Sequence, residues 1–573
     1  MTQPAEPTLD TAVASWIDED PDPATAAELS RLLRAHHDGD PEATAELVDA
    51  FAAPLSFGTA GLRGRLGPGP NRMNRAVVIR AATGLAAYLR SVVGEGFTVV
   101  IGYDARRGSE QFARDTASVV TGAGGRALLF EEHCPTPVLA FALRHLEADA
   151  AVMVTASHNP PQDNGYKVYL GGRVVSGWGQ GAQIVPPYDA DIAAAIRAVG
   201  PLASVPMPQA GWQTVGQTVR EEYVKRAAQA AHMGAAAPLR IVLTPLHGVG
   251  GDTCREALAR VGFEDVVKVA EQWEPDPDFP TLDYPNPEEP GALDLAVALA
   301  RSQGADLVIA NDPDADRCCV AVPDPSATEG WRQLSGDEVG ALLGEQAAEL
   351  AAFAGNGVLA SSVVSSRLLR RIAQTHGLAY QQTLTGFKWI SRVPNLVYGY
   401  EEALGYCVDP VAVRDKDGIS AAVRVAVLVS VLKQQGRSVI DLLDRLAREH
   451  GLHATSPLSI RVDDTSLITE AMERLRREGA PRLAGSPVTT VVDLRDGKPD
   501  GAGGRLPATD GLVWTTAADD RVVIRPSGTE PKLKCYCEVI VPVGKESVPR
   551  ARKAAAARLE SIKEDLRSVL RLG

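Results

Sequence analysis

The sequence predicts an α/β protein with three consecutive mixed α/β domains followed by a C-terminal α+β domain. Its 573 residues correspond to three to five domains, at roughly 100 to 200 residues each. A strand-like run followed by a long helical pattern occurs repeatedly, which is typical of βαβ units. Residues 456–573 differ, because strand-like runs there precede one final helix. These three observations define the predicted fold class.

Residues 1–50 are acidic and rich in alanine, and we expect them to form a helical extension. Stretches rich in Pro and Gly are the expected junctions between domains, because such compositions link domains rather than build them. They lie near 200–215, 323–330 and 450–457. The predicted divisions are domain I at 51–210, domain II at 211–335, domain III at 336–455 and domain IV at 456–573.

The paired strands and helices follow one another along the chain. In domain I, FTVVIG (97–102) predicts a strand and SEQFARDTASVVTGAGG (109–125) predicts the helix after it. Domain II repeats the pattern with RIVLTPLHGVGG (240–251) and DTCREALARVG. Domain III repeats it with GVLASSVV (357–364) and SSRLLRRIAQTHG. Domain IV contains the strand-like VTTVVDLR and ends in a charged, Ala-rich helix.

Charge and cysteine content limit the partners and the compartment. The formal net charge of −14 and the pI near 5.3 argue against nucleic acid and anionic membranes as partners. An anionic ligand must therefore meet a local basic site. The seven cysteines form no CxxC pair, which favours a reducing cytoplasm. No export is expected, since residues 1–22 lack a basic segment followed by an apolar one, and the apolar run at 423–432 is shorter than a membrane span.

The segment AVMVTASHNPPQDNGYKVY places a serine where a nucleophile is expected. An apolar strand-like run ends at Val154, and Ser157, His158 and Asn159 follow on a turn. Open α/β sheets bind ligands at the carboxyl ends of their strands, where a hydroxyl can reach a substrate. The alternative is a polar turn that Asn159 caps. This segment by itself does not decide between the two.

The segment DLVIANDPDADRCCVAV carries three carboxylates at alternating positions, Asp312, Asp314 and Asp316. Carboxylates so close together repel one another, so a bound divalent cation is the economical explanation. A calcium EF-hand would need Gly and Glu at the sixth and twelfth loop positions, which hold Arg317 and Pro323 here. Magnesium beside a phosphoryl group suits the site better, and a solvated acidic turn is the remaining alternative.

Together with FGTAGLRG (57–64) and RPSGTEPK (525–532), these motifs resemble the α-D-phosphohexomutase superfamily in order and spacing. The resemblance implies four domains around a central active-site cleft. It also implies a phosphoserine at Ser157 and one Mg²⁺ per active site, with Ser157, Asp312, Asp314 and Asp316 as ligands. The implied reaction moves phosphate between two hydroxyls of a sugar.

Arg63 lies in a Gly-rich loop, where a guanidinium can clamp phosphate oxygens. The late RPSGTEPK motif offers charges, hydroxyls and backbone amides for one dianion. It resembles the family's loop for the non-reacting phosphate of the substrate. The implied phosphate contacts are Arg525, Ser527, Gly528, Thr529 and Lys532.

The family's sugar-recognition loop resembles YGYEEALGYCVDPVAVRDKDG (398–418). Glu401 matches the family's glutamate, but Ala403 replaces its serine, which leaves discrimination between glucose and mannose open. An N-cap or loop carboxylate is an equally good interpretation of Glu401. The EEALGY and DKDG stretches, with Lys416, and TLTGFKW, with Lys388, are most similar to the phosphoglucomutase-2-like and phosphopentomutase branch.

Basic residues complete the expected site. Lys167 and Arg317 can offset charge on the transferring phosphoryl group, and by resemblance Lys167 positions or deprotonates the attacking hydroxyl. His158 is expected to orient the serine loop rather than to act as a base. The segment GYDARRGS, with Asp104, Arg106, Arg107 and Ser109, is expected to support the phosphoserine.

The resemblance implies an intramolecular phosphotransferase that interconverts a sugar 1-phosphate with a 6-phosphate or 5-phosphate through a bisphosphate intermediate. A sugar bisphosphate is the expected activator. The phosphoglucomutase and phosphopentomutase types are favoured, and phosphomannomutase is the alternative. A sugar-bisphosphate synthase and a metal-dependent phosphatase remain open. The phosphosugar is the only expected partner, and the sequence leaves the oligomeric state unknown.

Overall fold

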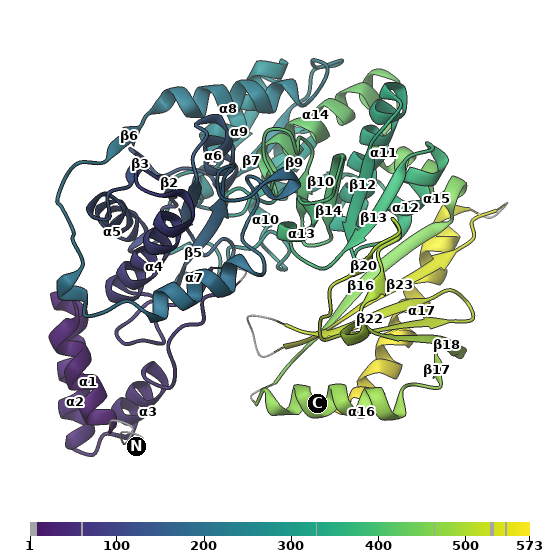
Figure 1. Cartoon of the computed structure of the whole chain (residues 1–573). Helices are drawn as coiled ribbons and strands as arrows, with labels where there is room; N and C mark the ends of the chain where they lie inside the picture. The colour runs from purple at the N-terminus through teal and green to yellow at the C-terminus, as the bar shows by residue number, and fades with distance from the viewer. Residues whose placement is uncertain are drawn as a thin grey trace. The chain divides into compact units, whose positions relative to one another are not determined.

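The computed structural model describes residues 8–58, 61–327, 329–462, 464–527, 532–544 and 547–572. The chain divides into two compact units, whose helices and strands are labelled in Figure 1. Unit 1 comprises Met1–Ala321 and Asp409–Val427, and unit 2 comprises Val322–Val408 and Leu428–Gly573. The division falls within β10 (Cys319–Pro323) and within α14 (Gly418–Gln434).

The N-terminal segment forms three helices, α1 (Leu9–Glu19), α2 (Pro23–His37) and α3 (Pro41–Ala50), drawn in purple in Figure 1. Asp22 and Asp40 cap α2 and α3, because each carboxylate accepts backbone N–H groups of the first turn and a proline follows directly. Leu29 and Leu47 lie in the small core that the three helices share. The sequence correctly predicts that residues 8–50 are largely helical.

The first sheet of unit 1 has six strands in the order β1-β5-β4-β2-β3-β6. The parallel strands are β2 (Thr98–Tyr103), β3 (Arg126–Phe130), β4 (Ala150–Val154) and β6 (Gln213–Val215). The strands β1 (Leu62–Arg65) and β5 (Asp163–Leu170) pair antiparallel. All five residues of β4 are buried, as expected for a strand inside a covered parallel sheet.

Four helices belong to this sheet: α4 (Arg75–Val93), α5 (Ser109–Gly122), α6 (Thr136–His145) and α7 (Tyr188–Arg197). The helices α4 and α7 approach so closely that a Cβ atom on Gly84 would lie 2.6 Å from the backbone nitrogen of Ile196. Only glycine fits at this crossing. Among the described residues, α4 is the one helix long and apolar enough to cross a membrane by length and composition, and core helices of globular domains pass the same test.

The second sheet has the strand order β11 (Trp331–Gln333), β10, β9 (Leu307–Ala310), β7 (Ile241–Thr244) and β8 (Val266–Lys268). The strands β9, β7 and β8 are parallel, and β10 is antiparallel to β9. Three helices accompany the sheet: α8 (Gln217–Gln229), α9 (Gly251–Val261) and α10 (Asp294–Gln303). The predicted strand and helix at 240–262 are therefore confirmed.

Unit 2 contains a four-stranded sheet and a larger antiparallel one. The first has the order β13 (Ala379–Thr383), β12 (Val358–Ser362), β14 (Leu396–Glu401) and β15 (Gly405–Cys407). Four helices accompany it: α11 (Gly336–Ala354), α12 (Leu368–Thr375), α13 (Phe387–Ile390) and α15 (Val439–His450). Ser335 and Glu338 form a capping box at the start of α11.

The C-terminal sheet has the strand order β16-β23-β22-β21-β18-β17 and is antiparallel throughout. Its strands are β16 (Leu452–Arg461), β17 (Arg482–Leu483), β18 (Ser486–Asp493), β21 (Leu512–Thr516), β22 (Arg521–Pro526) and β23 (Lys532–Val541). A short hairpin pairs β19 (Lys498–Pro499) with β20 (Arg505–Leu506). The helices α16 (Ser466–Glu478) and α17 (Val548–Leu570) pack with the sheet around the buried Trp514. The structure confirms the expected fold class.

Candidate functional site

Ser157 lies on the turn that follows β4, at the carboxyl end of a buried parallel strand. The residue is 3% exposed, and its hydroxyl donates a hydrogen bond of 2.8 Å to Oδ2 of Asp312. Its φ is +53°, a backbone conformation that non-glycine residues rarely adopt and that clusters at functional sites. The hydroxyl of Thr155 accepts the backbone N–H of Ser157 at 2.8 Å, which fixes the start of the turn. The serine is therefore held in one defined position.

Arg106 anchors the serine loop from the end of β2. Its guanidinium donates to the carbonyl oxygens of Ser157, Asn159, Pro160 and Asp163, over distances of 2.5 to 3.1 Å. Four carbonyl acceptors around one buried cation explain why an arginine stands here, since lysine has no fork of five donors.

The residues around Arg106 differ in their roles: Asp104 and Ser109 support its turn, whereas the side chain of Arg107 does not. The Asp104 carboxylate accepts the hydroxyl of Ser109 at 2.6 Å and so holds the turn that carries Arg106. The expected support from Arg107 is not found for its side chain. That side chain is 58% exposed and forms an ion pair with Asp278.

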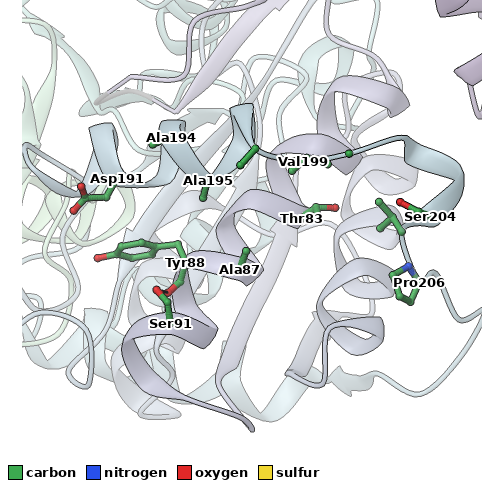
Figure 2. A pocket seen from close by; sticks show the side chains of 13 residues that line it. Thr83, Ala87, Tyr88, Ser91, Asp191, Ala194, Ala195, Val199, Ser204 and Pro206 are labelled. Atoms are coloured by element: carbon green, nitrogen blue, oxygen red, sulfur yellow. Dashed lines mark hydrogen bonds between the residues drawn. The ribbon is translucent and has the colours of Figure 1, made fainter.

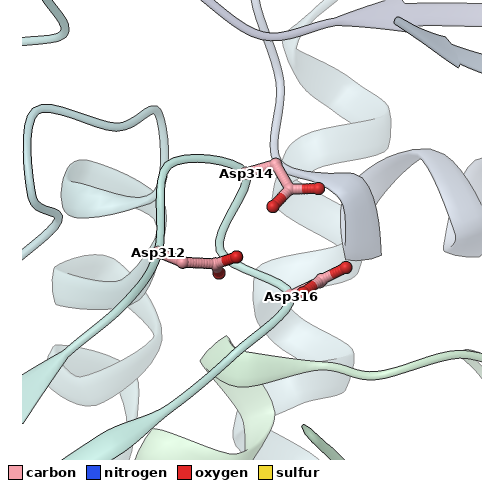
Figure 3. A group of neighbouring side chains, drawn as sticks. All are labelled: Asp312, Asp314 and Asp316. Atoms are coloured by element: carbon pink, nitrogen blue, oxygen red, sulfur yellow. The ribbon is translucent and has the colours of Figure 1, made fainter. Parts of the chain in front are cut away.

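Asp312, Asp314 and Asp316 follow β9 on one short loop, and Figure 3 shows the three side chains as neighbours on it. All three are buried, and one ligand oxygen from each lies within 4.8 Å of the other two. Ala315 between them has a φ of +55°, which turns the chain so that alternate side chains converge.

This donor set fits a divalent cation. Oδ1 of Asp314 and Oδ1 of Asp316 are buried and accept no hydrogen bond from the described residues. Unfilled buried carboxylate oxygens are costly unless a cation takes them. Burial, and next the carboxylates of Asp314 and Asp316, raise the pKa of Asp312 well above its usual range. Hard oxygen ligands of this kind are those that Mg²⁺ prefers.

Lys167 on β5 is bound directly to the aspartate loop. Its Nζ lies 2.8 Å from Oδ2 of Asp314 and 3.0 Å from Oδ2 of Asp316. Burial opposes the charge of Lys167, but the two aspartates outweigh it and raise the lysine pKa. The same contact outweighs burial at Asp314 and lowers its pKa below the usual range. Lys167 is therefore placed as a cation beside the aspartate loop, and its expected part in positioning or deprotonating the attacking hydroxyl stays a prediction.

Two further cations reach the same loop. Nζ of Lys416 lies 3.4 Å from Oδ2 of Asp316. Nε of Arg317 lies 3.9 Å from Oδ2 of Asp312 and 4.0 Å from Oδ1 of Asp316. Together with Lys167, these side chains form the local basic site that the acidic surface requires for an anionic ligand.

His158 lies between the serine and Arg317. Its Nδ1 is 3.2 Å from Oγ of Ser157, and its Nε2 is 3.4 Å from a guanidinium nitrogen of Arg317. Burial, then Arg317 and Arg63, lower the pKa of His158 well below its usual value, so the ring is neutral. Since arginine can only donate, Nε2 accepts and Nδ1 carries the proton. His158 then donates to the serine oxygen, and the orienting role expected for it stays a prediction.

Arg63 on β1 reaches the serine loop, where its Nη1 donates to Oδ1 of Asn159 at 3.2 Å. The strand pairs with β5 in the register Arg63 to Gly165. A Cβ atom on Gly165 would lie 2.6 Å from the carbonyl oxygen of Thr155, so glycine allows β1, β5 and the serine loop to approach closely. Arg63, Ser157 and Lys167 therefore belong to one cluster.

The expected recognition residues lie in unit 2. Glu401 ends β14 and accepts the backbone N–H of Gly386 at 3.1 Å, just ahead of Lys388 on α13. Arg525 at the end of β22 donates to the hydroxyl of Thr385 at 2.6 Å. Within unit 2, the segment 385–388 and the end of β22 are thus neighbours.

The expected phosphate loop is described only at its two ends. The backbone N–H of Ser527 donates to the carbonyl of Lys532 at 2.8 Å and closes the loop. Gly528 and Thr529 lie outside the described residues.

Thr136 is a contact that the sequence interpretation missed. Its hydroxyl donates to Oδ2 of Asp314 at 2.6 Å, and its backbone N–H donates to the carbonyl of Asp314 at 2.9 Å. The threonine begins α6, far from the aspartates in sequence. A threonine between two prolines at the start of a helix is a weak signal, which only its place beside Asp314 makes meaningful.

A groove of about 780 Å³ lies elsewhere in unit 1, between α4, α7 and the turn at Leu202–Ser204. Figure 2 shows Tyr88 and Ser91 on one wall and Asp191 on another. Small alanine side chains line much of it, and no residue of the serine and aspartate cluster is part of it. The groove therefore offers no group for the chemistry described above.

Models of four protein families match the chain in succession. They describe phosphoglucomutase/phosphomannomutase α/β/α domain I at 54–200, domain II at 221–326, domain III at 335–450 and the C-terminal domain at 490–540. All four domains of that enzyme family are thus found in the expected order.

Similar proteins agree with this match. A probable phosphomannomutase of Haemophilus influenzae is 44% identical over 81% of this chain and 93% of its own length. The phosphopentomutase of Homo sapiens is 34% identical over 97% of this chain and 95% of its own. The crystal structure of a putative phosphomannomutase from Thermus thermophilus has the same fold, with a TM-score of 0.66 at 24% identity over 89% of this chain and 99% of its own. The chain belongs to the phosphoglucomutase/phosphomannomutase family of the α-D-phosphohexomutase superfamily, whose members are intramolecular phosphotransferases.

Proposed function

We propose that this enzyme interconverts the 1-phosphate of a sugar with its 6-phosphate or 5-phosphate, through a phosphoserine at Ser157. The observation that carries the proposal is the position of this serine. Its oxygen is buried at a strand end and hydrogen-bonded to Asp312, next to two carboxylates with unfilled oxygens. Such a hydroxyl is placed to carry a phosphoryl group beside a divalent cation.

The metal proposed here is one Mg²⁺ per active site, held by Asp312, Asp314, Asp316 and an oxygen on Ser157. Bound there, it would neutralise charge on the oxygens of the transferring phosphoryl group. The fit of the three carboxylates supports this assignment.

The residues of unit 1 have separate parts in the transfer. The bond between phosphorus and Oγ of Ser157 breaks, and a bond between phosphorus and a sugar hydroxyl oxygen forms. Arg63, Lys167 and Arg317 stabilise the charge that spreads over the phosphoryl oxygens, because such transfers depend mainly on positioning and electrostatics. His158 orients the serine oxygen through its Nδ1–H. The sugar hydroxyl loses its proton and Oγ of Ser157 gains one, so the step balances overall.

The residues of unit 2, with Lys416 of unit 1, are proposed to hold the substrate. Arg525, Ser527, Gly528, Thr529 and Lys532 would bind the phosphate that does not react, while Glu401, Lys388 and Lys416 would contact the sugar and its phosphates. A sugar bisphosphate formed in the first step has to turn around before its other phosphate meets Ser157. A sugar bisphosphate is accordingly the proposed activator.

A pentose or glucose phosphate is the favoured substrate, and a mannose phosphate is the alternative. Ala403 in place of a serine removes one hydroxyl from the recognition loop, and the phosphopentomutase relative covers nearly the whole chain. The relative named as a probable phosphomannomutase is more identical but covers less of the chain. A site that hydrogen-bonds a substrate hydroxyl strongly rejects an analogue that lacks it, so the loss of one such contact at Ala403 weakens discrimination and several substrates are expected.

A metal-dependent phosphatase and a sugar-bisphosphate synthase are the competing functions. A phosphatase would pass the phosphoryl group from Ser157 to water, and a second phosphate site would serve no purpose in it. A synthase would take the group from an external bisphosphorylated donor. We propose the cytoplasm as the compartment, which the seven buried cysteine thiols support.

The test is a panel of 1-phosphates of glucose, mannose, ribose and deoxyribose, each with Mg²⁺ and a catalytic amount of sugar bisphosphate. Wild type is compared with Ser157→Ala, and intact mass reports a phosphate on the wild-type protein. We expect isomerisation by the wild type and none by the variant. Inorganic phosphate in place of isomer would make the enzyme a phosphatase, and an active Ser157→Ala would contradict the phosphoserine.

A further inference from the structure

Lys416 reaches the aspartate loop from a segment that is distant in sequence. The segment 409–418 follows β15 and belongs to unit 1. The Lys416 side chain is 12% exposed, and its Nζ lies 3.4 Å from Oδ2 of Asp316. A lysine side chain has four flexible carbons and loses rotamer entropy when it is fixed. Something must therefore hold this segment firmly if the ammonium is to stay at one place.

The first sheet fixes the segment at Asp415. The hydroxyl of Tyr169 on β5 donates to Oδ2 of Asp415 at 2.6 Å, and the side-chain amide of Gln183 donates to the same oxygen at 2.8 Å. Both Tyr169 and Asp415 are fully buried. Tyr169 stands two residues after Lys167, so both point to the same face of β5. The same face of β5 thus makes two contacts. Lys167 binds the aspartate loop, and Tyr169 binds Asp415, which is next to Lys416.

Helix α8, in the second α/β part of unit 1, fixes the segment at Asp417. The hydroxyl of Tyr223 on α8 donates to Oδ1 of Asp417 at 2.7 Å, and both residues are buried. That carboxylate also accepts the backbone N–H groups of Ile419 and Ser420, at the start of α14. Asp415 and Asp417 are the residues directly before and after Lys416. Each of them is therefore hydrogen-bonded by a tyrosine from a different element.

The backbone of the segment also touches the aspartate loop. The N–H of Gly418 donates to the carbonyl of Ala315 at 3.2 Å. A Cβ atom on Gly418 would lie 2.1 Å from the carbonyl oxygen of Arg317, so only glycine fits this contact. Segment and loop are therefore packed backbone to backbone, and small shifts of 415–418 move the Lys416 ammonium relative to Asp316.

Buried tyrosines with hydrogen-bonded hydroxyls are common in protein cores, so each pair alone could serve stability only. Tyr103 is such a case, since its hydroxyl donates to the carbonyl of Glu131 at 3.1 Å. The two pairs at Lys416 differ from it. They come from two separate elements, converge on the neighbours of one charged side chain, and act on a segment that contacts the aspartate loop.

We propose, on the basis of the function proposed above, that Tyr169 and Tyr223 are positioning residues that hold Lys416 at the aspartate loop for phosphoryl transfer. The two tyrosines do not touch the substrate. They fix the place of the ammonium ion before the substrate binds, which is where preorganised charge contributes to catalysis.

The kinetic test compares Tyr169→Phe and Tyr223→Phe with Tyr103→Phe as the matched control. We expect kcat to fall about tenfold in the first two variants, with KM changed less than threefold, because positioning acts mainly in the transition state. The control should keep the wild-type kcat. Equal effects of all three substitutions on kcat would overturn the proposal.

A double-mutant cycle identifies the residue through which the tyrosines act. If they act through Lys416, the variant Tyr169→Phe with Lys416→Met is no slower than Lys416→Met alone. Thermal unfolding should still show separate losses for the two substitutions. Multiplicative losses of kcat in the double variant would contradict the proposal.

A third measurement does not depend on turnover. Acetylation of lysines by sulfo-N-hydroxysuccinimide acetate, followed by mass spectrometry, reports how accessible Lys416 is in each folded variant. We expect Lys416 to react several-fold faster in Tyr169→Phe and Tyr223→Phe than in wild type, with Lys225, which is 55% exposed, as the internal reference. Unchanged Lys416 labelling overturns the positioning role, whereas a wild type without mutase activity would contradict only the proposed function.

Discussion

The two groups of candidate residues are held in place very differently. In unit 1, the transfer cluster of Ser157, Lys167, Asp312, Asp314 and Asp316 is buried and tied together by contacts of 2.8 to 3.0 Å. In unit 2, the recognition residues Glu401, Lys388, Arg525, Ser527 and Lys532 are all half-buried. The first group is fixed by charge in a dry interior. The second group lies at strand ends, on α13 and on the turn at Ser527, where its side chains are partly open to solvent.

This contrast matches what the proposed reaction asks of each group. Phosphoryl transfer gains from charges that are already in place, since interactions in a low dielectric are strong and need no reorganisation. A bisphosphate that turns around has to be accepted in two orientations, which suits longer and more exposed side chains. Substitutions in the cluster should therefore lower kcat, while those in the recognition group should raise KM.

The largest effect is expected from Asp314→Asn. The substitution removes one carboxylate from the cation site and leaves Lys167 with one acidic partner fewer. We expect kcat to fall about a thousandfold with little change of KM, the size typical for removal of a group that stabilises the transition state. Steady-state kinetics over a Mg²⁺ titration measure both the fall and the weaker metal dependence. A variant that keeps its kcat would contradict the assignment of the metal site.

A smaller loss of kcat is expected from Arg106→Lys. Lysine cannot reach the four carbonyl oxygens that Arg106 bonds, and each buried acceptor left unpaired costs about 1 to 3 kcal/mol. We expect kcat to fall on the order of thirtyfold and the unfolding temperature to drop by several degrees. Arg107→Lys is the neighbouring control and should change neither. Similar losses in both variants would mean that the four carbonyl contacts of Arg106 do not matter.

On the recognition side, Arg525→Lys should raise KM for the sugar phosphate about tenfold. Lysine keeps the charge but loses the planar fork that can bind phosphate and the Thr385 hydroxyl together. The kcat should stay within threefold of wild type, because the transfer cluster is unchanged. A fall of kcat with constant KM would contradict the expected difference between the transfer cluster and the recognition residues.

The smallest expected effect concerns stability in unit 2. Burial, then its neighbours Glu401 and Asp337, raise the pKa of Glu402 to about 7 from 4.5. Between pH 4.5 and 7 the unfolded chain has released this proton and the folded chain retains it, so the free energy of unfolding falls as pH rises. Glu402→Gln has no proton to lose and should remove this fall.

At pH 8 we expect Glu402→Gln to be more stable than wild type by about 1 kcal/mol, a value reduced for the partial exposure of the residue. At pH 4.5 the two should be equal. Thermal unfolding at both pH values measures the difference, with Glu478→Gln, an exposed carboxylate of unit 2, as the control. Parallel pH profiles of wild type and Glu402→Gln would contradict the raised pKa.

The sequence predicts best the features that lie within a few consecutive residues. Ser157 three residues after an apolar run, and aspartates at alternate positions after another, both lie on loops at strand ends in the structure. The fold class follows for the same reason, because the alternation of strand and helix is a local pattern.

The sequence predicts less well which partners the charged side chains contact. The sequence predicts a role for Lys167 at the attacking hydroxyl, but it gives no sign of the ion pairs that Lys167 forms with Asp314 and Asp316 in the structure. Arg107 was expected to support the serine loop, but only its neighbour Arg106 does so with its side chain. Adjacent arginines on a turn look alike in sequence, and the turn decides which one points inward.

The sequence by itself determined the fold class, the family and the identity of the serine and the three aspartates, because these depend on residues close together in the chain. Only the tertiary structure decided that Thr136 binds Asp314 across 178 residues and that Nε2 of His158 faces Arg317. It also decided that Tyr169 and Tyr223 bind Asp415 and Asp417, the two neighbours of Lys416. The physical reason is that hydrogen bonds act over about 3 Å. Such bonds connect residues that the folded chain brings together, and no local pattern records these partners.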